Sequence, residues 1–188
     1  MRPLSIFISP SHKGMNRNIT ERVDEILAPF SSDLRSDGYR NHVCRVVSFC
    51  EELFWLDEEE RHKITIAACF HDLGIYTDDT FDYLPPSIEL ARSYLVENHL
   101  DEWSDEIASM IDDHHRLTAQ KGNPLCEVFR KADLIDFSLG IFKKGVSRSK
   151  IAEVKSQFPN LGFHRNLARV AGRWICRHPF DPVPVVKW

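Results

Sequence analysis

The sequence lacks the features that mark several classes of protein. Its cysteines form no CxxC pair and are scattered among mostly apolar neighbours, so neither a thiolate zinc site nor a disulfide framework is expected. They are Cys44, Cys50, Cys69, Cys126 and Cys176. No apolar run is long enough for a membrane span or a secretory signal, and the short apolar stretch in MRPLSIFISPSHKG is interrupted by Ser and Pro. We therefore expect no membrane association and a reducing, cytoplasmic location.

An excess of basic residues is also missing. The formal net charge is -4 at pH 7, so no general attraction to a nucleic-acid polymer is expected. The sequence contains no GxSxG elbow, no P-loop and no GxGxxG turn, which argues against three common catalytic or nucleotide-binding plans. The length of 188 residues and the 43% hydrophobic content are ordinary for one globular domain.

Apolar residues recur at intervals of three and four along most of the chain, whereas alternating patterns typical of strands are almost absent. We therefore predict an all-α, single-domain bundle (1–188) of about seven or eight helices. The first helix is expected from Asn18, capped together with Glu21, to Ala28. Gly74 is expected to end the third helix. The other predicted helices span 39–54, 57–71, 85–98, 101–115, 124–139, 149–157 and 163–177, followed by an extended tail, HPFDPVPVVKW.

The adjacent pair His71 and Asp72 is a candidate metal-binding element. Two neighbouring residues cannot share one face in the middle of a helix, so they converge on one ion best at a helix end. Imidazole and carboxylate together suit Mn, Fe, Co, Ni or Zn in an exchangeable site. By itself, a His-Asp pair is also common at helix ends and on surfaces.

Two further polar residues fall on apolar helix faces. His42 shares a face with Val46 and Phe49, and Asp133 lies among apolar residues in FRKADLIDFSLG. A buried imidazole can be satisfied by a backbone carbonyl, but a buried carboxylate needs a cation or several donors. A shared metal ion would satisfy both residues together with His71.

These segments, in this order, resemble the HD-domain superfamily of metal-dependent phosphohydrolases. The matching elements are His42 with Arg45, the helix end ACFHDLG, and KADLID, over roughly residues 39–140. The resemblance implies an all-α bundle with ligands projecting inward from separate helices. It implies His42, His71, Asp72 and Asp133 as ligands of one divalent transition metal, and it leaves the C-terminal helices and tail (147–188) outside the metal-site core.

A pair of histidines in DDHHR extends the candidate site. Two-metal members of the superfamily carry a similar element and one more histidine before it, but here His99 is the single histidine in that interval and ENHLDEW is typical of a surface helix end. One metal is therefore expected, with a second left open. His114 and His115 are predicted to be catalytic, as phosphate ligands or as a proton donor; exposed side chains that cap the helix are the alternative.

The sequence departs from the superfamily at Ile75, where many members have Lys or Glu. One familiar phosphate contact and one familiar general acid are thus missing. We nominate Arg45 and Lys131 as substrate-binding cations because they lie close to the ligands in sequence, and Arg40 is a further candidate. A surface position is the alternative for each of them. A basic stripe in the last predicted helix could form a wall for an anionic ligand or a solvated face. It consists of Arg165, Arg169, Arg173 and Arg177.

The sequence as a whole predicts a metal-dependent hydrolase that activates water against a phosphate ester or a nucleotide-like small molecule, with Asp72 orienting that water. Two alternatives stay open. One is an HD-type hydratase or hydrolase of a non-phosphate, nitrile-like substrate, and the other is a non-catalytic regulatory module that binds a metal or ligand. A homo-oligomer is also compatible with the sequence.

Overall fold

The computed structural model describes residues 12–34 and 37–186. All regular secondary structure in these ranges is helical, which confirms the predicted all-α class, and eight of the helices have ten or more residues. The elements are α1 (His12–Leu27), η1 (Ala28–Phe30), α2 (Ser31–Leu34), α3 (Gly38–Leu53), α4 (Glu58–Phe70), α5 (Gly74–Thr77), α6 (Leu84–Glu97), η2 (Asp101–Trp103), α7 (Ser104–Asp113), α8 (Pro124–Phe137), α9 (Arg148–Gln157) and α10 (Phe163–Arg177).

Most predicted helices are present within a turn of their expected ends, and α10 has the bounds that the periodicity predicts. The first helix is an exception: it begins at His12, so the cap predicted at Asn18 is wrong. The helix predicted from 101 to 115 is divided into η2 and α7. No helix in the described part of the chain is both long and apolar enough to cross a membrane.

Side-chain caps fix the starts of the two helices that lead to the candidate site. The Asp57 carboxylate accepts from the Glu60 backbone N–H, and the Glu60 carboxylate accepts from that of Asp57, which forms a capping box ahead of α4. The Asn123 side chain accepts from the first backbone N–H groups of α8, and Pro124 occupies the position where a missing N–H is tolerated. Local sequence thus sets where α4 and α8 begin.

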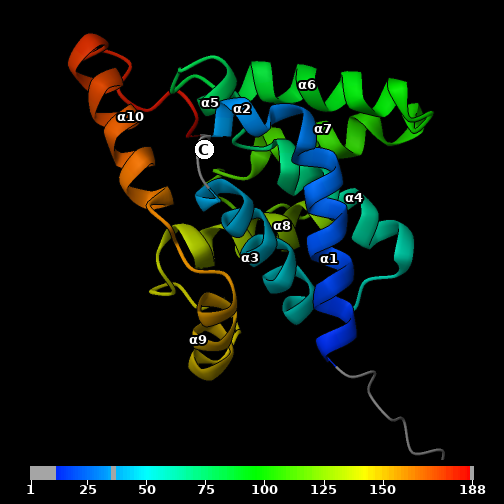
Figure 1. Cartoon of the computed structure of the whole chain (residues 1–188). Helices are drawn as coiled ribbons and strands as arrows, with labels where there is room; N and C mark the ends of the chain where they lie inside the picture. The colour runs from blue at the N-terminus through cyan, green and yellow to red at the C-terminus, as the bar shows by residue number, and fades with distance from the viewer. Residues whose placement is uncertain (1–11, 35–36, 187–188) are drawn as a thin grey trace, which may run out of the picture.

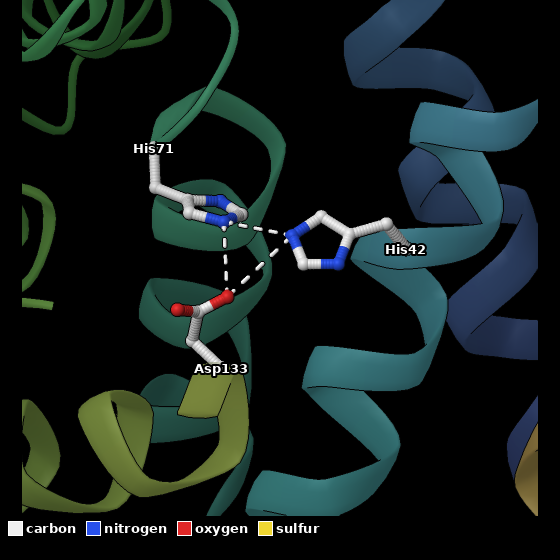
Figure 2. A group of neighbouring side chains, drawn as sticks. All are labelled: His42, His71 and Asp133. Carbon is white, nitrogen blue, oxygen red and sulfur yellow. Dashed lines mark hydrogen bonds and ion pairs between the residues drawn. The ribbon is translucent and has the colours of Figure 1, made fainter. Parts of the chain in front are cut away.

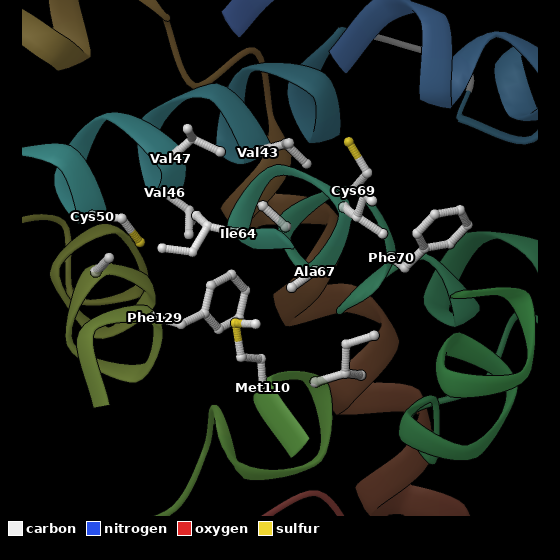
Figure 3. Packing of buried hydrophobic residues seen from close by; sticks show 14 of the residues in the cluster. Val43, Val46, Val47, Cys50, Ile64, Ala67, Cys69, Phe70, Met110 and Phe129 are labelled. Atoms are coloured by element: carbon white, nitrogen blue, oxygen red, sulfur yellow. The ribbon is translucent and has the colours of Figure 1, made fainter. Parts of the chain in front are cut away.

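Helix α3 is the centre of the bundle. Every residue from Asn41 to Cys50 is buried, because α1, α4, α8 and α9 all pack against this helix. In Figure 3, Val46 of α3 and Ile64 of α4 converge with Phe129 of α8 and Met110 of α7. The four helices that build this core also carry the polar candidates, so the packing of the core determines how those side chains meet.

Gly74 has a different role from the one predicted. Helix α4 ends at Phe70, and Gly74 is the first residue of the short helix α5 rather than the end of α4. A Cβ at this position would lie 2.7 Å from the Tyr83 carbonyl oxygen and 2.9 Å from Pro86 Cγ. Its N–H donates to Ser87 Oγ at 3.0 Å. Glycine is therefore required because the start of α6 approaches the backbone closely.

Helix α10 lies at one side of the bundle, and the chain after it turns back toward the body of the molecule (Figure 1). This tail is not extended as predicted. Two turns are closed by backbone hydrogen bonds. The Asp181 N–H donates to the His178 carbonyl, and the Val186 N–H donates to the Val183 carbonyl. The Trp174 indole N–H donates to the Asp181 carbonyl at 2.8 Å, which ties the tail to α10.

Candidate metal centre

The four predicted ligands come together in the interior. His42 projects from α3, His71 follows the last turn of α4, and Asp133 projects from α8 (Figure 2). Asp72 comes directly after His71 in the chain. All four side chains are buried. The His42 and His71 Nε2 atoms are 3.0 Å apart, and each lies 3.6 Å from Asp133 Oδ1. Metal–ligand bonds of about 2.1 Å place neighbouring ligand atoms about 3.0–3.4 Å apart, so these separations are close to those of ligands around one ion.

Asp72 joins this group because the helix has already ended. Its Oδ2 lies 3.6 Å from His71 Nε2 and 3.8 Å from His42 Nε2. The backbone leaves the α4 path after Phe70, so the carboxylate of Asp72 and the imidazole of its neighbour can face the same point.

The histidines of the site are held by their outer nitrogens. His71 Nδ1 is 2.8 Å from the Ala68 carbonyl oxygen, and His114 Nδ1 is 2.7 Å from that of Ile111. A carbonyl can only accept, so Nδ1 carries the proton in both rings. His42 Nδ1 makes the equivalent bond to Asp136 Oδ2 at 2.7 Å. All three Nε2 atoms are consequently free to bind a metal, which is the usual arrangement of ligand histidines.

His114 lies nearer the ligands than predicted. Its Nε2 is 3.5 Å from Asp72 Oδ1, and both atoms are buried without a hydrogen-bond partner within the described ranges. Buried polar atoms are rarely left unsatisfied, and a cation between these two would satisfy both. The residues present therefore fit a divalent metal, and His114 is as well placed to ligate it as the four residues that the resemblance implies.

His115 faces a different partner. Its Nε2 lies 2.6 Å from the hydroxyl of Tyr83, and burial, with the neighbouring His114, lowers the pKa of His115 to about 3. Burial also raises the pKa of Tyr83 well above 10, so its hydroxyl stays protonated and donates to His115. Sequence reasoning missed Tyr83, because it stands in an irregular loop that carries no periodic signal. His115 also groups with His114 and Asp133 as a further set that could hold a cation.

The charges of the site support one another. Burial lowers the pKa of His71, but the carboxylates of Asp72 and Asp133 outweigh this effect and raise it to about 9. Burial opposes ionisation of Asp72, yet His71 and His114 hold its pKa far below the usual range. Without a metal, the site therefore keeps its carboxylates ionised and one proton on an imidazole, which a divalent cation would displace.

Arg45, which was predicted to bind substrate, is instead held by Asp136 in the interior. Its Nε and Nη2 donate to the two oxygens of Asp136 at 2.6 and 2.8 Å, and its Nη1 donates to the Phe158 carbonyl at 2.8 Å. The side chain is fully buried. Arg45 instead fixes Asp136, which in turn orients His42 and has its own pKa lowered by both partners against the effect of burial. The motif spacing in KADLID was an available signal for Asp136.

Lys131, which was also predicted to bind substrate, does not line the cavity at the site. Its Nζ lies 3.3 Å from Glu127 Oε1 on the same helix, and its side chain is 38% exposed. The basic stripe of α10 is exposed along its whole length, as the solvated-face alternative expects.

A cavity of about 480 Å³ opens beside the candidate ligands. Asp133, His114 and His115 line it. Three cations also line it, namely Arg116, Arg130 and Lys144. The remaining walls are largely apolar and come from α8, α10 and the tail. The site is therefore accessible to a small molecule with both an anionic and an apolar part.

The family model of the HD domain matches residues 39–138, which is more than half of the chain. The chain belongs to the HD domain family. This family consists mostly of metal-dependent phosphohydrolases. Comparison with curated proteins and with solved structures gives no match. The HD domain match runs from the start of α3 to the end of α8 and so contains every candidate ligand, whereas α9, α10 and the tail lie beyond it.

Proposed function

We propose that this HD domain protein is a metal-dependent phosphohydrolase that acts on a phosphate ester or a nucleotide-like small molecule. The observation that carries the proposal is the orientation of three imidazoles. His42, His71 and His114 each bond outward through Nδ1 and turn Nε2 toward the carboxylates of Asp72 and Asp133. His114 and Asp133 of this arrangement also line a cavity large enough for a small substrate.

The donor set selects the class of metal. Nitrogen and carboxylate oxygen donors without thiolates suit Mn, Fe, Co, Ni or Zn in a catalytic site. The chemistry that such an ion supplies when bound is Lewis acidity toward a phosphoryl oxygen and an increased acidity of water. We propose one such ion, held by His42, His71, Asp72 and Asp133, with His114 as a further ligand or as the residue that contacts the substrate.

The residues of the chain would divide the remaining tasks. The carboxylate oxygen Asp72 Oδ1, which has no hydrogen-bond partner in the described ranges, would orient the attacking water. His115, which its lowered pKa keeps neutral and the Tyr83 hydroxyl holds at the cavity wall, would donate a hydrogen bond from its Nδ1–H to the leaving oxygen. Both groups lie within or beside the cluster that would bind the ion, which favours a single reaction centre.

The phosphate charge would be met by cations of the cavity rather than by Arg45 or Lys131. Arg116 and Arg130 already pair with Asp113 and Glu127. Lys144 has no carboxylate partner within the described ranges, so its charge is available to a ligand. We propose that Lys144 replaces the lysine that many relatives carry at the position of Ile75.

The experiment is a metal and activity survey. The purified chain is stripped with a chelator and reloaded separately with Mn, Co, Ni or Zn. It is assayed for phosphate release from phosphomonoesters and nucleoside triphosphates, and for conversion of cyclic dinucleotides to linear products. We expect activity with at least one metal and its loss in His71→Ala and Asp133→Ala. His99→Asn is the control, because His99 is an exposed histidine whose left-handed backbone suits asparagine.

The same survey separates the alternatives. Metal that binds in stoichiometric amount without turnover of any substrate would favour a non-catalytic module. Turnover of a nitrile without phosphate release would favour an HD-type hydratase or hydrolase of a non-phosphate substrate. Unchanged metal content in His71→Ala and Asp133→Ala would show that the ligands are assigned wrongly.

We further propose that the protein works in a reducing compartment such as the cytoplasm. Its cysteines are free, and four of the five are buried. Burial raises the pKa of Cys44 and of Cys126 to about 12, so these thiols pack as small apolar groups.

A further inference from the structure

The cavity beside the candidate ligands is lined by two chemically different kinds of side chain. A few are charged, such as Asp133 and Lys144, whereas most are hydrocarbon, such as Leu167 and Val183. A ligand that fills it therefore needs both a charged part and an apolar part.

Part of the apolar wall comes from the segment of the chain that lies beyond the HD domain match. Leu167 and Ala171 of α10 face the cavity, while Arg169 and Arg173 of the same helix are exposed. The tail adds Val183 and Val186, and its buried residue Val185 fixes it against the core. The α10 and tail segments thus extend the HD domain site with a second surface of defined chemistry.

The described lining contains no serine, threonine, asparagine or glutamine side chain. Two of the polar side chains that it does contain are already bonded within the protein: the Tyr83 hydroxyl bonds His115, and His164 bonds the Asp136 carbonyl and the Asn160 side chain. A sugar or a base would bury hydroxyl and amide groups against this wall without partners, which is unfavourable. A hydrocarbon group would instead gain by leaving water.

We infer that the substrate is a phosphomonoester whose leaving group is apolar, an alkyl or aryl alcohol rather than a nucleoside or a sugar. This inference rests on the proposed phosphohydrolase function. In the reaction, a water oxygen forms the new bond to phosphorus and the bond from phosphorus to the ester oxygen breaks. A proton from the water ends on that ester oxygen, which leaves inorganic phosphate and a free alcohol or phenol.

Binding of non-hydrolysable phosphonates tests the inference independently of turnover. The full chain, loaded with Mn²⁺, is titrated by calorimetry with ethyl-, butyl- and hexylphosphonate and with adenosine monophosphate. Affinity is expected to rise by up to about fourfold for each methylene that enters the apolar part, and by at least about tenfold from ethyl to hexyl. Adenosine monophosphate is expected to bind more weakly than hexylphosphonate.

A matched pair of variants locates the effect. Ala171→Phe fills the apolar part and is expected to reduce hexylphosphonate affinity about tenfold while leaving ethylphosphonate affinity nearly unchanged. Gly172→Phe is the control, since a side chain at this position of α10 meets open space. Metal content and melting temperature verify the fold of both. If Ala171→Phe does not fold, Leu167→Asn gives a second test. In that variant the affinity for phosphonates is expected to stop rising with alkyl length.

The outcomes separate the inference from the proposed function. Affinity that does not change with alkyl length, or tighter binding of adenosine monophosphate than of hexylphosphonate, overturns the inference even if phosphate esters are hydrolysed. Chain-length-dependent binding without hydrolysis of hexyl phosphate supports the apolar subsite and overturns the proposed hydrolase instead.

Discussion

The imidazoles of His42 and His71 face each other through their Nε2 atoms, which are 3.0 Å apart. Two lone pairs at this distance repel, so a positive centre must lie between them or beside them. In the metal-free protein this centre is the proton that the raised pKa keeps on His71. A proton and a metal ion therefore compete for the same place.

This competition predicts a pH dependence of stability in the chelator-treated protein. The pKa of His71 is about 9 in the folded chain and about 6.5 when unfolded, so its stabilising contribution is complete below pH 6.5 and is lost as the pH rises through 9. The loss is on the order of 3 kcal/mol. Urea unfolding at pH 6.5 and pH 9 should show it in the original chain and not in His71→Gln. If the free energy of unfolding changed equally between the two pH values in both proteins, the assignment of the raised pKa to His71 would be contradicted.

Arg45 is expected to stabilise the fold rather than to bind substrate. Arg45→Ala leaves Asp136 buried without its bidentate partner, which should lower the free energy of unfolding by about 3–5 kcal/mol. Arg40→Ala is the control, because Arg40 pairs with Asp24 at the surface and should cost about 1 kcal/mol or less. Urea titration measures both. Equal stability of the two variants, with a raised KM in Arg45→Ala, would return Arg45 to the substrate site.

Tyr83 is expected to position His115. Tyr83→Phe removes the hydroxyl that donates to His115 Nε2 and should lower kcat about tenfold, equivalent to about 1.4 kcal/mol, with no change in metal content. Tyr94→Phe serves as the control, since Tyr94 lies on α6 and outside the cavity. Metal analysis and steady-state kinetics provide the two readouts. If Tyr83→Phe kept full kcat, His115 would have no part in the reaction.

Gly74 is expected to tolerate no side chain. The Cβ of Gly74→Ala would press on the Tyr83 carbonyl, a backbone atom that cannot rotate away, so we predict a loss of about 1–3 kcal/mol. Gly172→Ala, on the exposed side of α10, should instead stabilise by about 0.5–1 kcal/mol because alanine favours a helix interior. Thermal melting of the two variants tests whether Gly74→Ala destabilises the fold and Gly172→Ala stabilises it. A neutral Gly74→Ala would mean that α5 and α6 can separate at little cost.

Several features of the fold could be predicted because they depend on neighbours in sequence. The capping pair Asp57 and Glu60 and the Asn123 cap place the starts of α4 and α8. The wrong start predicted for α1 at Asn18 has the same origin. A residue that suits an N-cap does not begin a helix when the residues before it are themselves helical. The role of Gly74 was predicted wrongly because the close approach of α6 to its backbone leaves no pattern in the local sequence.

The sequence by itself determined the helical class and the residues that the structure brings together as candidate metal ligands, because periodicity, caps and the order of the His, His-Asp and Asp segments are local properties of the chain. Only the tertiary structure decided what each side chain meets. Arg45 is directed to Asp136, Tyr83 to His115, and α10 with the tail against the candidate metal site. These contacts join residues far apart in sequence, and a side chain's partner is set by the packing around it.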